Sequence, residues 1–163
     1  MINGTYMEAY GRLRFLIEKE APSEREHAPE WEYAHMSSTA HLGRILALKR
    51  GYDPDKAALA CLLHDIGRIA TGRQHLHAAA GEEPARDMLR GLGISPEDGE
   101  EIVLAVVNHG RKEETGSPLE EIVKDADVLD CALYGLYFPK EAFDRRLERL
   151  EQEMGISLGR GKG

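Results

Sequence analysis

Apolar residues recur at intervals of three and four along this chain, between short interruptions that contain glycine or proline. This interval matches the period of an α-helix, whereas a half-buried strand would alternate apolar and polar residues. The interruptions are too close together for long helices. The pattern therefore predicts an all-α protein with helices over residues 5–20, 30–50, 54–69, 76–91, 96–109, 118–137 and 139–154.

Local signals support several of these helix ends. A capping residue followed by proline begins three helices, at Asp53-Pro54, Ser95-Pro96 and Ser117-Pro118. Gly51 suits a helix C-terminus because two cations precede it. Pro84 interrupts the segment 76–91, so that helix could instead begin at Pro84 after a separate turn over residues 77–83.

The length of 163 residues fits one domain, since no repeat or long linker divides the chain. We expect a single compact helical bundle over residues 1–163, with a C-terminal helix over 139–154 and a flexible tail over 155–163. The last helix carries an apolar stripe of Phe143, Leu147, Leu150 and Met154. Such a stripe usually packs on its own core, and the alternative is a homodimer.

The charge balance restricts the partners. Twenty-one basic and 29 acidic residues give a net charge of −8. This argues against nonspecific binding to nucleic acid or to an anionic membrane, because both need a basic face. No apolar run reaches the roughly 20 residues of a membrane span, and the N-terminal residues do not form a signal peptide. We therefore expect a cytoplasmic protein.

Histidines on the inner faces of the helices are the main functional signal. His64 and Asp65 follow the apolar segment 57–63, where burial of either side chain is costly without a partner. One explanation is a hydrogen-bonded core pair. However, His35 and His109 also share helix faces with apolar residues. Three inward histidines and an aspartate indicate a metal site, and these donors suit zinc, iron, manganese or nickel better than calcium.

The arrangement of His35, of His64-Asp65 within LLHDIG, and of Asp127 within KDADVLD resembles the HD superfamily of metal-dependent phosphohydrolases. The resemblance covers about residues 30–135. It implies an HD-type helical bundle and a metal bound by His35, His64, Asp65 and Asp127. The periodicity of the segment 118–137 instead favours Asp125, which lies nearer the apolar stripe, so both aspartates stay candidates.

Two further histidines resemble steps of HD subfamilies that hold two metals. His77 begins the segment HAAAG, and Asn108-His109 stands where the cyclic dinucleotide phosphodiesterases of this superfamily have two histidines. The resemblance implies that Asp65 bridges two ions and that His77 and His109 bind the second. Because Asn108 departs from the pattern, one ion is the alternative. The expected cofactor is a divalent transition metal, with iron or manganese favoured and zinc, nickel or magnesium as alternatives.

The reaction implied by the resemblance is hydrolysis of a phosphate ester or anhydride by a metal-activated water. Asp65 would orient or deprotonate that water. Arg68, where the family often has lysine, would stabilise the phosphoryl oxygens. Arg68 and Lys124 are the expected substrate-binding cations. Other cations lie near the proposed ligands, and the sequence does not choose among them: Arg73, Arg111 and Lys112.

The sequence predicts the substrate only as a class. The compact chain lacks a glycine-rich phosphate loop and a Gly-Tyr-Pro step. A small phosphorylated substrate, of the size of a nucleotide, fits these features best. The alternatives are a regulatory protein that binds a metal or nucleotide without turnover, and a di-iron oxygenase. A purely structural bundle with core histidines would bind no metal.

Overall fold

The computed structural model describes residues 3–20 and 23–159. Within these ranges the chain is all α, as the apolar spacing predicts. In chain order the helices are α1 (Asn3–Phe15), the π-helical turn η1 (Leu16–Glu20), α2 (Pro29–Arg50), α3 (Pro54–Leu63), α4 (Ile66–Thr71), α5 (His77–Ala80), α6 (Glu82–Gly91), α7 (Pro96–Asn108), α8 (Pro118–Leu133) and α9 (Glu141–Met154). Residues 160–163 of the predicted tail lie outside the described residues.

The predicted helix starts at three proline positions are confirmed. The side chains of Asp53, Ser95 and Ser117 accept hydrogen bonds from backbone N–H groups in the first turns of α3, α7 and α8. On α8 the cap is reciprocal, because Glu120 also bonds back to the backbone of Ser117. Gly51 ends α2 in the left-handed conformation, with φ 67°. These local bonds replace those that the helix termini lack.

Two predicted helices are each divided in the structure. The segment 54–69 breaks at His64-Asp65, which separates α3 from α4. Asp65, with φ −99° and ψ 15°, leaves the helical conformation there. The segment 76–91 divides at Gly81, and α6 begins two residues before Pro84 rather than at it. The first break turns the chain within the interior, so His64 and Asp65 are buried at a corner between two helices.

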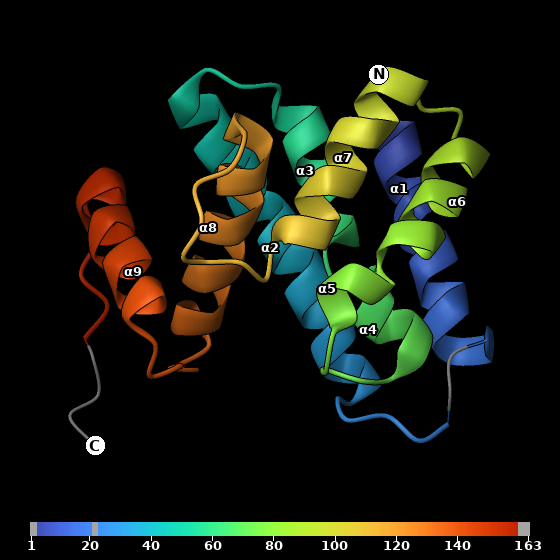
Figure 1. The fold of residues 1–163 in the computed structure, drawn as a ribbon, viewed down its shortest axis with the longest axis horizontal. Helices are drawn as coiled ribbons and strands as arrows, with labels where there is room; N and C mark the ends of the chain where they lie inside the picture. The colour runs from blue at the N-terminus through green and yellow to red at the C-terminus, as the bar shows by residue number, and fades with distance from the viewer. Residues whose placement is uncertain (1–2, 21–22, 160–163) are drawn as a thin grey trace.

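Helix α2 packs against α3 and α8; α3 also contacts α1 and α7, and α8 also contacts α7 and α9. Figure 1 shows α9 at one end of the molecule and α1 with α6 at the other, with α2, α3 and α8 between them. The α9 stripe is covered by its own chain, since Phe143, Leu147 and Leu150 are buried. The stripe therefore packs on the core of its own chain, with Met154 partly buried against it. None of the described helices has the length and apolar character needed to cross a membrane.

Candidate metal centre

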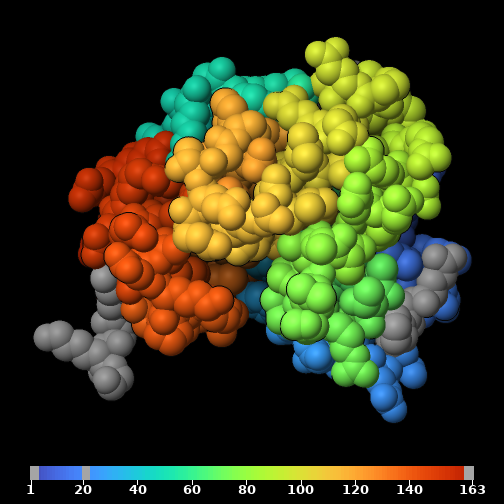
Figure 2. Space-filling model, in the orientation of Figure 1, coloured from blue at the N-terminus to red at the C-terminus, as the bar shows by residue number. Residues whose placement is uncertain are grey.

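A cavity of about 630 Å³ opens between the α4–α5 segment and the α8–α9 segment. Figure 2 shows this hollow between the green and the orange parts of the surface. Residues of α2 and of the loop that follows α7 also line it. The predicted metal ligands that line it are His35, Asp65, His77, His109 and Asp127. The sequence thus identified residues from five separate helical segments that meet at one cavity.

The carboxylate of Asp65 lies at the centre of the cluster and faces two pairs of imidazoles. Its Oδ2 atom is 3.2 Å from Nε2 of His35 and 3.1 Å from Nε2 of His64. Its Oδ1 atom is 3.2 Å from Nε2 of His77 and 3.4 Å from Nε2 of His109. Both oxygens are buried, and neither accepts a hydrogen bond of acceptable geometry. Each oxygen therefore faces a pair of imidazole nitrogens.

Asp127 joins this cluster from α8. Its Oδ1 atom is 3.3 Å from Nε2 of His35 and 3.7 Å from Nε2 of His64. Its Oδ2 atom accepts a hydrogen bond of 2.6 Å from Nζ of Lys112. Asp127 therefore faces the same imidazole pair as one oxygen of Asp65, as the motif resemblance implies.

Asp125, the alternative from periodicity, lies away from the histidines. It is fully buried among three arginines, with contacts of 2.8 Å to Arg50, 2.8 Å to Arg146 and 2.9 Å to Arg149. Two of these arginines come from α9 and one from α2. The nearness of Asp125 to the apolar stripe therefore reflects an internal ion-pair network that fastens α9 to the bundle.

Each of four cluster imidazoles is fixed by a bond from its Nδ1 atom to an oxygen that acts only as an acceptor. The acceptors are the Cys61 carbonyl for His64, Gln74 carbonyl for His77, Val106 carbonyl for His109 and Asp130 carboxylate for His35, at 2.6–2.7 Å. In a neutral ring this places the proton on Nδ1 and a lone pair on Nε2.

These Nε2 atoms converge in pairs. Those of His35 and His64 lie 3.1 Å apart, and those of His77 and His109 lie 3.0 Å apart. Two lone pairs this close repel unless a proton or a metal ion lies beside them. Nδ1 bonded to an acceptor and Nε2 directed inward is the usual state of histidine metal ligands. The cluster thus fits divalent transition metals.

The ionisation of the cluster reflects burial and the two carboxylates. Burial opposes ionisation of Asp65, but the charges of Arg68 and His64 outweigh it and hold the pKa of Asp65 well below its usual value. Burial also disfavours protonated His64, yet Asp65 and Asp127 raise its pKa to about 9. For His109 burial dominates and lowers the pKa to about 4. A metal entering beside His64 must therefore displace a proton.

Arg68 reaches the cavity but is already paired. Its Nε and Nη2 atoms donate to the two carboxylate oxygens of Glu32 at 3.1 and 2.9 Å, and Nη2 lies 2.6 Å from Oδ2 of Asp65. The guanidinium thus neutralises two buried acids. Glu32 belongs to no motif in the sequence, although it precedes His35 by three residues on α2 and a helical wheel places the two side by side.

The prediction that Lys124 binds substrate is not supported by its position. Its buried Nζ donates to the Glu114 carbonyl at 2.8 Å, and its side chain does not line the cavity. Lys112 lines the cavity instead. Arg73 and Arg111 have mostly exposed side chains that pair with surface glutamates. Sequence spacing did not reveal that Lys112 faces the cluster, because the conformation of the loop after α7 places its side chain there.

Comparison with known proteins agrees with this geometry. The family model described as HD domain matches residues 33–132. The chain is 35% identical to the putative phosphohydrolase YueE of Bacillus subtilis over 113 residues, which are 60% of this chain and 64% of that protein. It is 34% identical to ribonuclease Y of Geobacter sulfurreducens over 122 residues, 74% of this chain and 22% of that protein. It thus spans less than two thirds of either relative.

A solved structure shares the fold. The crystal structure of a predicted HD superfamily hydrolase from an uncultured Thermotogales bacterium superposes with a TM-score of 0.59, at 21% identity, over 91% of this chain and 88% of that chain. The family model covers more than half of the sequence, and the histidines and aspartates of the motif meet in one cluster. The chain therefore belongs to the HD domain family.

Proposed function

We propose that this protein is a metal-dependent phosphohydrolase that cleaves a phosphate ester or anhydride of a small, nucleotide-like substrate. The observation that carries the proposal is the carboxylate of Asp65. Both of its oxygens are buried without a hydrogen bond, and each faces a different pair of imidazole nitrogens, while the Arg68 guanidinium forms an ion pair with Oδ2 alone. A carboxylate in this position suits two cations, one at each oxygen.

The cluster divides into two donor sets that share Asp65. His35, His64, Asp65 and Asp127 would hold one ion. Asp65, His77 and His109 would hold the other. When bound, the divalent ions supply a water of lowered pKa and positive charge for the phosphoryl oxygens. Iron or manganese suits these mixed nitrogen and oxygen donors, and zinc, nickel and magnesium are alternatives.

Asn108 supports a smaller second donor set. Its side-chain nitrogen donates to Oε2 of Glu120 at 3.1 Å. It thus bonds to the first turn of α8 and does not contribute to the cluster. The second ion would be held by two histidines and the shared carboxylate of Asp65, with the remaining positions open to water and substrate.

Lys112 is the cation best placed for the substrate phosphate. Its Nζ lies 2.6 Å from both the His109 carbonyl and Oδ2 of Asp127, and its side chain lines the cavity. A phosphoryl oxygen at the cluster would therefore lie near this ammonium group. Arg68 contributes positive charge beside Asp65 but remains bonded to Glu32. Together the two cations lower the cost of bringing an anion to this acidic chain.

The size of the cavity favours a small molecule. Its volume of about 630 Å³ lies within the usual range of small-molecule sites, roughly 300–1,000 Å³. The name of ribonuclease Y states an activity on RNA, but the net charge of −8 opposes binding of a long polyanion by this chain. A nucleotide presents the same phosphate chemistry in a molecule that the cavity can hold.

Metal content is the direct test. Protein purified without a chelating column should contain about two ions per chain by elemental analysis, and His77→Ala or His109→Ala should reduce this to about one. His41→Ala is the matched control, because His41 is exposed on α2 outside the cavity. One ion in the wild type, unaffected by either change, would contradict the two-ion site.

Activity separates the alternatives. Protein reconstituted with manganese or iron should release phosphate from nucleotides. Tight nucleotide binding without turnover in any metal would favour a regulatory protein. A strict requirement for iron with a mixed-valence EPR signal would favour an oxygenase. Failure to bind any metal would return the histidines to a structural role.

A further inference from the structure

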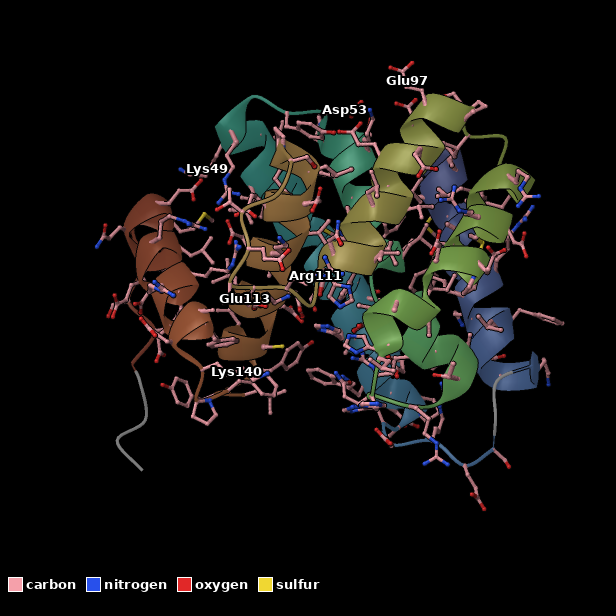
Figure 3. All side chains as sticks on the ribbon, viewed as in Figure 1. Lys49, Asp53, Glu97, Arg111, Glu113 and Lys140 are labelled. Atoms are coloured by element: carbon pink, nitrogen blue, oxygen red, sulfur yellow. The ribbon has the colours of Figure 1, made fainter. Side chains whose placement is uncertain are left out.

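The cavity has two chemically different walls. One wall carries the metal-binding cluster with Lys112 and Arg68. The other is mostly apolar and aromatic, and we call it the aromatic wall; it consists of Trp31, Tyr134, Leu136, Phe138 and Phe143. In Figure 3 the labelled Lys140 marks the edge of this wall, just before α9. A molecule that fills the cavity contacts both walls.

Much of the aromatic wall is exposed to solvent. Tyr134, Leu136 and Phe138 are 48, 41 and 46% exposed, although all three are large. They lie on the segment between α8 and α9. Clustered apolar side chains at the mouth of a polar site are typical of ligand-binding surfaces, because a ligand removes them from water.

The aromatic wall begins at the metal-binding cluster itself. The Trp31 ring stacks on the His35 ring, with centroids 5.0 Å apart and planes at 13°. Tyr134 meets the edge of Trp31 at 5.2 Å and 70°. A group attached to a phosphate at the cluster would therefore extend along these rings. The wall residues lie outside residues 33–132, the part that the family model matches.

We propose that the aromatic wall binds the base of a nucleotide whose phosphate lies at the cluster, and that it selects nucleotides over sugar phosphates. This inference rests on the proposed phosphohydrolase function. Four aromatic rings, from Trp31, Tyr134, Phe138 and Phe143, line the same wall. Flat rings suit a planar base better than an alkyl chain, and stacking accepts any base. The wall thus predicts preference for a nucleotide without choosing its base.

A comparison of two substrates tests the inference by activity. Adenosine 5′-monophosphate and ribose 5-phosphate share the sugar phosphate, and only the first has a base. We expect kcat/KM to favour the nucleotide on the order of tenfold. The double variant Tyr134→Ala/Phe138→Ala should remove this preference and leave ribose 5-phosphate unchanged. Tyr134→Phe, which retains the ring, should behave as wild type.

Leu133→Ala is the matched control, since Leu133 is 51% exposed beside the wall but does not line the cavity. It should leave both substrates unaffected. Equal losses on the two substrates in the double variant, or no loss on either, would overturn the inference. A higher kcat/KM for octyl phosphate than for the nucleotide would do the same, because it would show a site for an alkyl chain.

Binding can be measured without turnover, because Trp31 is the only tryptophan in the chain. Manganese-loaded protein should show saturable quenching of Trp31 fluorescence by an adenosine phosphonate, which is not hydrolysed, and none by methylphosphonate. Absence of quenching, together with turnover of ribose 5-phosphate, would overturn base binding and keep the hydrolase. Quenching without turnover of any phosphate ester would overturn the hydrolase and keep base binding.

Discussion

Gly67 lies where α4 meets the backbone of α5, and we predict that Gly67→Ala disables one half of the metal centre. An added Cβ would lie 2.5 Å from the backbone nitrogen of Gly81 and would approach the His77 carbonyl oxygen still more closely. Ordinary contact begins at 3.4 Å, so the α5 backbone must move by at least 3.4 − 2.5 = 0.9 Å.

This displacement is large for a metal ligand. Ligand distances in metal sites vary by only about 0.2 Å, so His77 carried away with α5 would no longer hold an ion. His35, His64 and Asp127 come from other helices and should stay in place. We expect about one ion per chain instead of two, and a loss of stability of about 1–3 kcal/mol from overpacking.

The assay is elemental analysis together with urea unfolding followed by circular dichroism. Gly99→Ala is the control, because Gly99 lies on α7 with no atom within 4 Å of its added Cβ. It should keep both ions and stabilise the protein by about 1 kcal/mol through helix propensity. A natively helical Gly67→Ala protein that binds two ions with wild-type affinity would refute the reasoning.

Three other predictions concern stability. Burial opposes ionisation of Glu121, but its bonds to Arg146 and to the backbone of Gly116 lower the pKa of Glu121 from 4.5 to about 2. Because this pKa is lower in the folded state, the ionised group stabilises the fold above about pH 4.5, and that stabilisation, at most about 3 kcal/mol, is lost as the pH falls toward 2. Glu121→Gln should therefore be less stable at pH 7 and show a flatter pH dependence in urea titrations; an unchanged slope between pH 5 and 2 would contradict this. Arg146→Met removes a buried partner of Asp125 and Glu121 and should cost about 3–5 kcal/mol, measured by urea unfolding at pH 7. Removal of metal by a chelator should lower Tm by about 5–10 °C at an ion concentration of about 100 Kd, and calorimetry with and without added manganese would check it.

The sequence predicts the helix starts and the inward histidines because both depend on residues close in the chain. Proline after a capping residue determines the start of α3, and apolar spacing directs His35 and His109 inward. The break at His64-Asp65 was not predicted. It depends on the packing of α4 against the α5 backbone, which spacing within one segment does not report.

Asp125 and Lys124, both on α8, are candidate site residues by sequence but do not reach the site, and the two errors have a common cause. This helix is covered by α2 on one side and by α9 on another, so it is buried nearly all round and its apolar stripe does not identify one inner face. Asp125 and Lys124 are both buried, yet neither faces the cavity. Arg146, a partner of Asp125, lies on α9, and the Glu114 carbonyl that Lys124 contacts lies in the loop before α8.

The partners of the imidazole Nδ1 atoms restrict how the metal centre can evolve. His64, His77 and His109 each donate to the main-chain carbonyl of the residue three positions earlier, and no point substitution can delete a carbonyl. His35 instead donates to the side chain of Asp130. Such a carboxylate makes the imidazole a stronger electron donor. Inherited variation in ligand strength through these partners is thus concentrated at position 130, and it acts only through His35.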